Sequence, residues 1–148
     1  MRIEKDFKEF IALLNTNKVR YMIVGGFAFS FHAEPRFTKD IDIFILADIP
    51  NSRRILKSIE DFGFTKSGLT KDDFIAPGRV IQLGQAPIRI DIVTSIDGVG
   101  FAAAWKKRVT GNYGGVPAFF ISKNDLIKNK LSLKRPQDLV DVRRLREI

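Results

Sequence analysis

Residues 24–46 read Val-Gly-Gly-Phe-Ala-Phe-Ser-Phe-His-Ala-Glu-Pro-Arg-Phe-Thr-Lys-Asp-Ile-Asp-Ile-Phe-Ile-Leu, and this stretch decides the fold. The apolar run 21–24 leads into two glycines, and residues 27–32 are compatible with a short helix. The Glu-Pro pair at 34–35 forces a turn, because a residue before proline is disfavoured in the helical region. The run 40–45 begins with the alternation of a strand. The stretch therefore predicts a strand, a glycine pair, a helix, a turn and a second strand.

Two acidic residues share one face of the second strand. The period of two places Asp40 and Asp42 on one side and Ile41 and Ile43 on the other. Their Cα atoms are then about 6.6 Å apart. Two like charges this close repel each other, and a cation between them relieves the repulsion. Magnesium ions are typically held by one or two carboxylates together with substrate phosphates, so the pair is a candidate magnesium site.

The glycine pair is a candidate phosphate site. Glycine allows a close approach of the backbone to a ligand and tolerates positive φ angles. A helix that begins directly after Gly25-Gly26 points free N–H groups and the positive end of its dipole at an anion. Taken alone, a glycine pair is usually a turn, and an Asp-x-Asp pair is usually a solvated strand face. The order in which they occur here is far more specific than either motif.

Composition indicates one soluble globular domain over residues 1–148. Hydrophobic residues make up 45% of the 148 residues, and there is no cysteine, which excludes disulfides and fits a reducing cytoplasm. The N-terminus has no apolar signal core. The longest uncharged run, residues 21–33, is shorter than the roughly 20 residues of a membrane-spanning helix. We therefore expect a cytoplasmic protein without a membrane partner.

The positive charge gathers in the C-terminal third. Residues 1–99 carry 14 basic and 13 acidic side chains, whereas residues 100–148 carry 11 basic and 4 acidic side chains, which together give the net charge of +8. A basic segment suggests a polyanionic partner such as RNA, DNA or nucleoside triphosphates. The alternatives are solubility and adaptation to heat.

The remaining pattern predicts an α/β (α+β) chain with a mixed sheet and helices on it. Helices are expected at 3–16, 52–62, 101–109 and 123–133, and a last helix from Pro136. Residues 68–79 are expected to form a mobile loop. Strands are expected at 79–84, 88–94 and 116–121, with a hairpin turn at 84–87.

Asp91 lies on the 88–94 strand, where Arg89, Asp91 and Val93 share a face. Taken alone, it is an ordinary exposed aspartate. Three carboxylates that converge from two neighbouring strands can hold two metal ions, and the resemblance described next implies this role for Asp91.

This arrangement resembles the nucleotidyltransferase superfamily, which includes DNA polymerase β, kanamycin nucleotidyltransferase and the CCA-adding enzymes. Gly25-Gly26, Asp40 and Asp42 match the shared motif, and Asp91 matches the third acid. Many members carry a serine after the first glycine, where this chain has Gly26 and, one turn later, Ser30. The segment 36–42 looks most similar to the small AbiEii- and MenA-like proteins.

The resemblance extends from residue 20 to residue 145. AbiEii-like proteins carry a lysine on one helix and Asp-x-x-Asp on the next, matched by Lys130 and by Asp138 with Asp141. We expect Leu139, Val142 and Leu145 to point inward and the two acids to be exposed or half-buried. Lys130 can contact the triphosphate or can form a structural ion pair with Asp141, and both interpretations stay open.

The resemblance implies a minimal nucleotidyltransferase fold, with a core at about 20–121 and a C-terminal helical segment at 122–148. It implies catalytic and metal-binding roles for Asp40, Asp42 and Asp91, and nucleotide binding by Gly25, Gly26, Ser30 and Lys130. Two Mg²⁺ ions are expected, with Mn²⁺ as the alternative. The substrate would be a nucleoside triphosphate, and the acceptor a hydroxyl group of RNA or tRNA, a protein or a small molecule.

Three functions follow. The first is an active transferase, including a toxin-type enzyme that acts on tRNA, with or without a partner protein. The second is a catalytically silent nucleotide-binding or toxin–antitoxin interaction module with the same fold. The third, an unrelated metal-dependent hydrolase, has little support because the chain contains a single histidine.

Overall fold

The structure, a computed structural model, describes residues 4–65, 67–85 and 88–148, and leaves the side chains of residues 85 and 88 undescribed. Its helices are α1 (Lys5–Thr16), α2 (Gly25–His32), α3 (Ile49–Asp61), α4 (Phe101–Lys106), α5 (Lys123–Leu133) and α6 (Pro136–Arg146), with one short 3₁₀ helix, η1 (Lys71–Phe74). Its strands are β1 (Tyr21–Val24), β2 (Asp40–Ile45), β3 (Val80–Gln85), β4 (Ile88–Val93), β5 (Val109–Tyr113) and β6 (Val116–Phe120).

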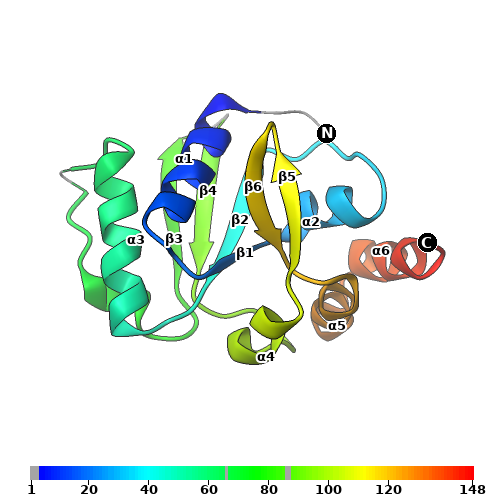
Figure 1. The fold of residues 1–148 in the computed structure, drawn as a ribbon. Coiled ribbons are helices and arrows are strands. Elements are labelled where there is room, and N and C mark those ends of the chain that lie inside the picture. Colours follow the sequence, from blue (N-terminus) through cyan, green and yellow to red (C-terminus); the bar gives the residue numbers. More distant parts are fainter. Residues whose placement is uncertain (1–3, 66, 86–87) are drawn as a thin grey trace.

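The strands form one six-stranded mixed sheet in the order β3-β4-β2-β1-β6-β5. β1 is parallel to β6 and β2 is parallel to β4, while the other neighbouring strands are antiparallel. Helices α1 and α3 lie on the left of β5 and β6 in Figure 1, and α2, α5 and α6 gather on the right. The predicted mixed sheet flanked by helices is confirmed.

Alternation along the central strands gives the sheet two different faces. Tyr21 pairs with Ile45 and Ile23 pairs with Ile43, so these side chains share one face. Helix α1 covers this face, because the Tyr21 hydroxyl donates a hydrogen bond to Asn15 Oδ1 at 2.8 Å. Val24 pairs with Asp42 on the opposite face. The acidic residues of β2 therefore point away from α1.

Several predicted boundaries were wrong for local reasons. Helix α3 begins at Ile49 and not at residue 52, because Asp48 caps it by accepting a hydrogen bond from the Asn51 N–H and Pro50 fits the first turn. Strand β5 was not predicted. Its sequence, Val-Thr-Gly-Asn-Tyr, is polar and contains a glycine, and it lies at the edge of the sheet with β6 as its one partner strand.

The segment expected to be a loop at 68–79 contains η1, whose start is closed by reciprocal hydrogen bonds between Thr70 and Asp73. Phe74 is buried there. The predicted turn at 84–87 lies partly outside the described residues, as does the start of the helix predicted from residue 3. No helix in the described part of the chain is both long and apolar enough to cross a membrane.

Candidate active site

Strand pairing brings the three predicted acids onto one face of the sheet. In the parallel pair of β2 and β4, Asp42 lies directly beside Asp91, and Asp40 lies beside Arg89. All four side chains share a face, because residues two apart on a strand point the same way. The predicted convergence of Asp40, Asp42 and Asp91 from neighbouring strands is therefore present in the structure.

Arg89 is a cation built into this acidic face. Its Nη2 lies 2.5 Å from Asp40 Oδ2, and its Nε lies 3.3 Å from Asp91 Oδ1. The second contact lacks hydrogen-bond geometry, so both of these buried atoms have no hydrogen-bond partner among the described residues. The strand period predicted that Arg89 shares a face with Asp91, but no role was predicted for it. The side chain partly neutralises the acids that would otherwise repel each other.

Burial and neighbouring carboxylates raise the pKa of Asp42 above that of an ordinary aspartate. Removal from water raises the pKa of Asp42 to about 7, and the nearby charges of Asp91 and Asp40 act in the same direction. Burial also raises the pKa of Asp91, with Arg89 opposing and Asp40 adding to the increase. A bound divalent cation would favour the ionised forms of both groups.

We expect the metal-free protein to lose stability as pH rises. The folded state holds a proton on Asp42 between the ordinary pKa of 3.8 and about 7, where the unfolded chain has released it. The free energy of unfolding therefore falls as pH rises through this window. Urea denaturation with chelator at several pH values measures the change. Asp42→Asn should flatten this dependence, and Asp72→Asn, at an exposed position of η1, should leave it intact.

The chemistry of the acids fits a hard divalent cation. The donors are carboxylate oxygens, as such ions require, and Asp91 Oδ1 is buried with no hydrogen bond to satisfy it. Within the described residues, no three acidic or imidazole side chains are already grouped as metal ligands. The guanidinium of Arg89 contacts both Asp40 and Asp91. The site therefore has suitable metal ligands, and the side chain of Arg89 lies among them.

Gly25 brings the backbone against the acidic face. Its φ angle is +67°, and a Cβ atom placed on it would lie 2.3 Å from Asp42 Oδ2. Any other residue would be strained in this conformation and would collide with the carboxylate. Helix α2 begins here, and Val24 before it provides no side-chain cap. The free N–H groups of α2 therefore start next to Asp42.

Gly26 is constrained in a different way from the one predicted. A positive φ was predicted at the glycine pair, and within the pair the positive angle belongs to Gly25 and not to Gly26. At Gly26, an added Cβ would lie 2.3 Å from Thr38 Cγ2. Thr38 belongs to the segment that leads into the Asp-x-Asp strand. The requirement for glycine here comes from close packing of α2 against that segment.

We expect Gly26→Val to weaken nucleotide binding by about tenfold or more while the domain stays folded. The valine would push Thr38 and the start of β2 away from the N-terminus of α2. Calorimetry with a nucleoside triphosphate and Mg²⁺ measures the affinity, and circular dichroism checks the fold.

Two further variants sharpen this test. Thr38→Ser removes the methyl group that the valine meets, so the double variant should recover part of the affinity. Gly100→Val is the matched control, because an added Cβ there meets nothing within 4 Å. Unchanged affinity in folded Gly26→Val would mean that the glycines form a turn and no binding site.

Ser30, predicted to bind nucleotide, is buried one turn into α2. Its hydroxyl accepts a hydrogen bond of 3.2 Å from the backbone N–H of Arg36. The side chain therefore holds the segment between α2 and β2 in place. The single histidine, His32, contacts the Ile121 carbonyl at 2.6 Å, and burial lowers its pKa.

Lys130 lies in a buried ionic network and not on an open surface. Its Nζ is 2.8 Å from Asp141 Oδ2 and 3.7 Å from Asp138 Oδ1. Arg36 makes a two-pronged contact with Asp141, and Arg135 pairs with Asp138. Burial alone would raise the pKa of Asp141, but hydrogen bonds from Arg36 and Lys130 lower it well below its usual range. The ion pair with Asp141 is thus formed, while triphosphate contact by Lys130 stays a prediction.

The network also corrects the predicted faces of α6. Asp138 and Asp141 are buried, whereas Leu139 is 51% exposed. The carboxylates turn inward because they compensate the buried charge of Lys130 and anchor Arg36. Arg36 stacks on the Phe29 ring, 3.9 Å from its centroid. The segment before the Asp-x-Asp strand is therefore fixed to both α2 and α6.

Acidic partners neutralise some of the basic side chains of the C-terminal third. Besides Lys130 and Arg135, Lys107 contacts Asp125 and Arg144 contacts Glu34. Charges paired in this way attract a polyanion less strongly. The expected RNA partner therefore depends on the other basic residues of this segment.

The chain belongs to the family described as "Nucleotidyltransferase of unknown function (DUF6036)", whose model matches residues 1–146. No curated protein matches the sequence. The superfamily indicated by the motifs is therefore confirmed, and the closer resemblance to AbiEii- and MenA-like proteins stays a prediction.

Solved structures show the same fold. The lincosamide antibiotic adenylyltransferase LnuA in its lincomycin-bound form is 18% identical, with a TM-score of 0.63 over 100% of this chain and 99% of its own. ANT(2")-Ia in complex with adenylyl-2"-tobramycin is 16% identical, with a TM-score of 0.57 over 94% and 84%. A nucleotidyltransferase-like protein from Paracoccidioides brasiliensis is 14% identical, with a TM-score of 0.55 over 97% and 77%. At these identities the likeness concerns the fold alone.

Proposed function

We propose that this protein is a metal-dependent nucleotidyltransferase that moves a nucleoside monophosphate from a nucleoside triphosphate to a hydroxyl acceptor. One observation carries the proposal. The turn at Gly25, where α2 begins, lies against the carboxylate of Asp42, which in turn is the strand partner of Asp91. Phosphate-binding N–H groups and metal-binding carboxylates thus meet at one point, as transfer of a phosphoryl-linked group requires.

Each group has a distinct task in this mechanism. The N–H groups at the start of α2 bind the triphosphate. Asp40, Asp42 and Asp91 would hold Mg²⁺, which when bound neutralises phosphate charge and favours the ionised acceptor. The acceptor oxygen attacks the α-phosphorus in line, the bond to the β-phosphate oxygen breaks, and pyrophosphate leaves. Asp91, kept ionised by the bound cation, accepts the proton of the acceptor hydroxyl.

Arg89 must be included in this proposal, because it contacts two of the three acids. Binding of a cation by Asp40 and Asp91 requires Arg89 to release them. The freed guanidinium would then lie beside the phosphates, where it can bind their oxygens. Before substrate binds, Arg89 would neutralise the acids in place of the metal ion. After substrate binds, it would be a ligand of the phosphates.

The acceptor is proposed from fold and charge. LnuA, a lincosamide adenylyltransferase, spans almost the same length as this chain, which supports a small hydroxyl compound as acceptor. The unpaired basic residues support RNA or tRNA, which a toxin-type enzyme would modify, and a partner protein could deliver either. Incubation with each labelled nucleoside triphosphate, with total tRNA in one set and hydroxyl-bearing antibiotics in another, identifies the class by label transfer. Absence of label in every set would favour a silent nucleotide-binding module.

We expect Mg²⁺ together with a nucleoside triphosphate to raise the melting temperature. A ligand that binds only the folded state stabilises it by about 2.7 kcal/mol at a hundredfold excess over Kd. Either ligand alone should have a much smaller effect, since each neutralises the other's charge. Thermal denaturation with the four triphosphates, with and without Mg²⁺, measures the shift. If none of the eight conditions moves the transition, the proposed site is wrong.

A further inference from the structure

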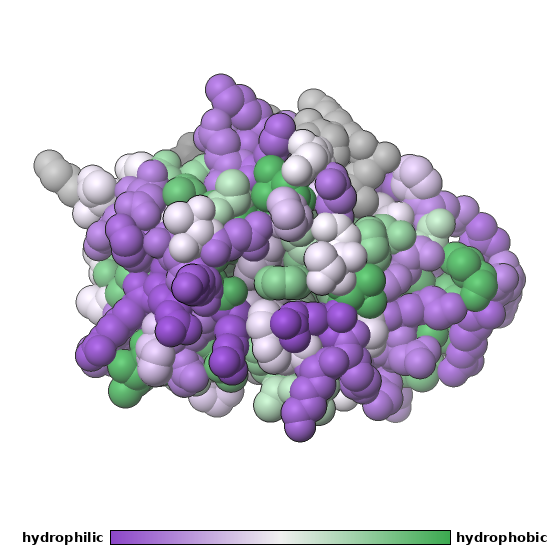
Figure 2. All heavy atoms as spheres, in the orientation of Figure 1, coloured by the Kyte–Doolittle hydropathy of each residue, from purple (hydrophilic) through white to green (hydrophobic). Residues whose placement is uncertain are grey.

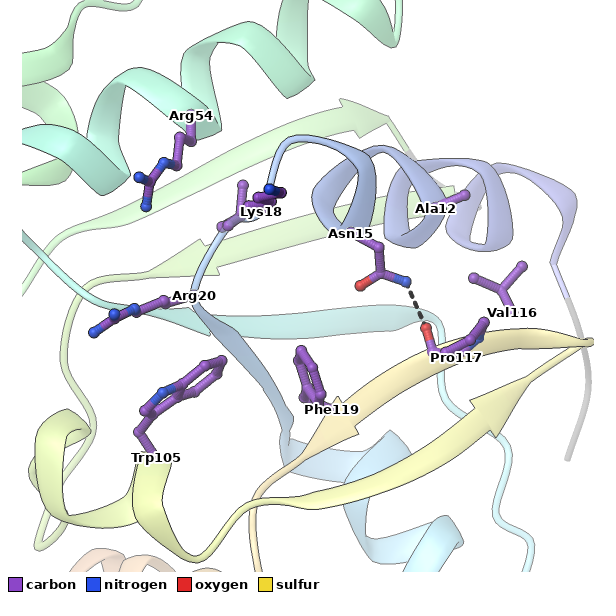
Figure 3. Close-up of a pocket in the computed structure, with 10 residues that line it drawn as sticks. Ala12, Asn15, Lys18, Arg20, Arg54, Trp105, Val116, Pro117 and Phe119 are labelled. Carbon is purple, nitrogen blue, oxygen red and sulfur yellow. Dashed lines mark hydrogen bonds between the residues drawn. The ribbon is translucent and has the colours of Figure 1, made fainter.

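A cavity lies on the face of the sheet that α1 covers. Its volume is about 780 Å³, within the range of sites for small molecules. Its lining comes from α1, the α1–β1 connection, α3, α4 and β6, and consists of Ala12, Asn15, Lys18, Val19, Arg20, Arg54, Trp105, Val116, Pro117 and Phe119. Figure 3 shows Trp105 and Phe119 side by side with Arg20, Arg54 and Lys18 around them.

This cavity is separate from the acidic site. The Tyr21 ring lies 5.6 Å from the ring of Phe119, and its hydroxyl bonds to Asn15, so the cavity is on the Tyr21 face. Asp42 is the partner of Val24 and points to the opposite face. A ligand in the cavity would therefore be separated from the acids by the sheet and cannot be the acceptor in the transfer reaction.

The walls are apolar and their few polar groups are engaged. The Asn15 amide donates to the Pro117 carbonyl at 2.7 Å, shown as a dashed line in Figure 3, and its oxygen accepts from Tyr21. The rings of Trp105 and Phe119 meet edge to face at 5.4 Å. Neither a sugar nor a nucleobase would find many partners there. An apolar chain or ring fits these walls better.

The rim, in contrast, is cationic. The side chains of Lys18, Arg20 and Arg54 take part in none of the ion pairs found among the described residues. Arg108 adds charge behind the wall, 3.7 Å from the Trp105 ring centroid, and its Nε is buried without a hydrogen-bond partner. Over the face that Figures 1 and 2 both show, hydrophobic residues are interleaved with hydrophilic ones. Cations without acidic partners beside an apolar hollow match a ligand of opposite charge.

We propose that this cavity binds a small amphiphilic carboxylate, with its apolar body against Trp105, Phe119 and Pro117 and its carboxylate on the cationic rim. Arginine is suited to this task because its planar guanidinium binds a carboxylate through two parallel hydrogen bonds. The apolar body supplies affinity by leaving water. The site is independent of the proposed transferase activity.

The only tryptophan of the chain reports on this site directly. Trp105 lines the cavity and no other tryptophan is present, so its fluorescence can be titrated with octanoate, with uncharged octanol and with acetate. Octanoate should change the emission saturably. Octanol should need a concentration higher by about tenfold or more, and acetate should have no effect. Equal binding of octanol and octanoate, or no saturable change with octanoate, would overturn the proposal.

Charge-removing variants test which cationic side chains of the rim bind the carboxylate. Arg20→Gln combined with Arg54→Gln should raise the Kd for octanoate by about tenfold or more. Both residues are exposed, so the fold should survive, and circular dichroism confirms that. Arg143→Gln, which removes an exposed charge from α6, should leave the Kd unchanged, and so should Asp42→Asn. An Arg20/Arg54 variant that binds octanoate like the wild type would contradict the assignment of the rim.

Discussion

Asp42→Asn should abolish metal-dependent nucleotide binding and transfer together, whereas Asp91→Asn should keep nucleotide binding and lose transfer. Asp42 contacts the glycine turn at which the triphosphate would bind, so it serves both steps. Asp91 lies on the neighbouring strand and is proposed to accept the proton of the acceptor. Loss of a general base typically lowers a rate by about 10²–10⁴-fold. The expected affinity of Asp91→Asn is within about threefold of the wild type.

Calorimetry for nucleotide affinity and label transfer for turnover, run on the same preparations, measure the two effects. Asp72→Asn is the matched control, because it removes one exposed carboxylate from η1, which belongs to neither strand of the acidic face. Both readouts should be unchanged in it. A wild-type protein that binds nucleotide tightly but transfers to no acceptor, with Asp91→Asn indistinguishable from it, would favour the silent binding module and contradict the enzyme.

Much of the acidic site could be predicted because it depends on local period and short-range order. The alternation from Asp40 to Ile43 fixed the shared face of the two acids. The glycine pair indicated a helix there, although α2 begins at Gly25 and not after the pair. Placement of Asp91 beside Asp42 needed more, because strand pairing is set by the whole sheet. That step came from resemblance to a known superfamily, and the register of β2 and β4 bears it out.

The features that the sequence did not reveal depend on contacts between distant segments. Burial of Asp138 and Asp141 follows from Lys130 and from Arg36, which lies 105 residues away from Asp141. No helical period predicts that two carboxylates should turn inward, since isolated charges are costly to bury. Likewise, the glycine at 26 is required by Thr38, which only the tertiary fold brings near. The sequence shows the basic residues of the C-terminal third, but it does not show which of them form ion pairs.

Arg89→Met should increase the affinity of the nucleotide-free protein for a divalent cation by about tenfold or more. In the structure the guanidinium of Arg89 bonds to Asp40 at 2.5 Å and lies 3.3 Å from Asp91, so it competes with a metal ion for both acids. Methionine keeps much of the side-chain length but carries no charge. Without Arg89, three neighbouring carboxylates would repel each other in the absence of metal. The metal-free variant should therefore be less stable than the wild type, and Mn²⁺ should restore its stability.

Electron paramagnetic resonance of free Mn²⁺ measures the affinity without turnover, and thermal denaturation with chelator measures the metal-free stability. Arg79→Met is the matched control, because Arg79 pairs with the half-buried Asp73 of η1 and with none of the three acids, and its Mn²⁺ affinity should match the wild type. Weaker Mn²⁺ binding in Arg89→Met would show that the arginine positions the carboxylates for the metal and does not compete with it. Loss of Mn²⁺ binding in Asp42→Asn but not in Asp72→Asn would still place the metal at the acids. The role of Arg89 and the location of the site are thus tested separately.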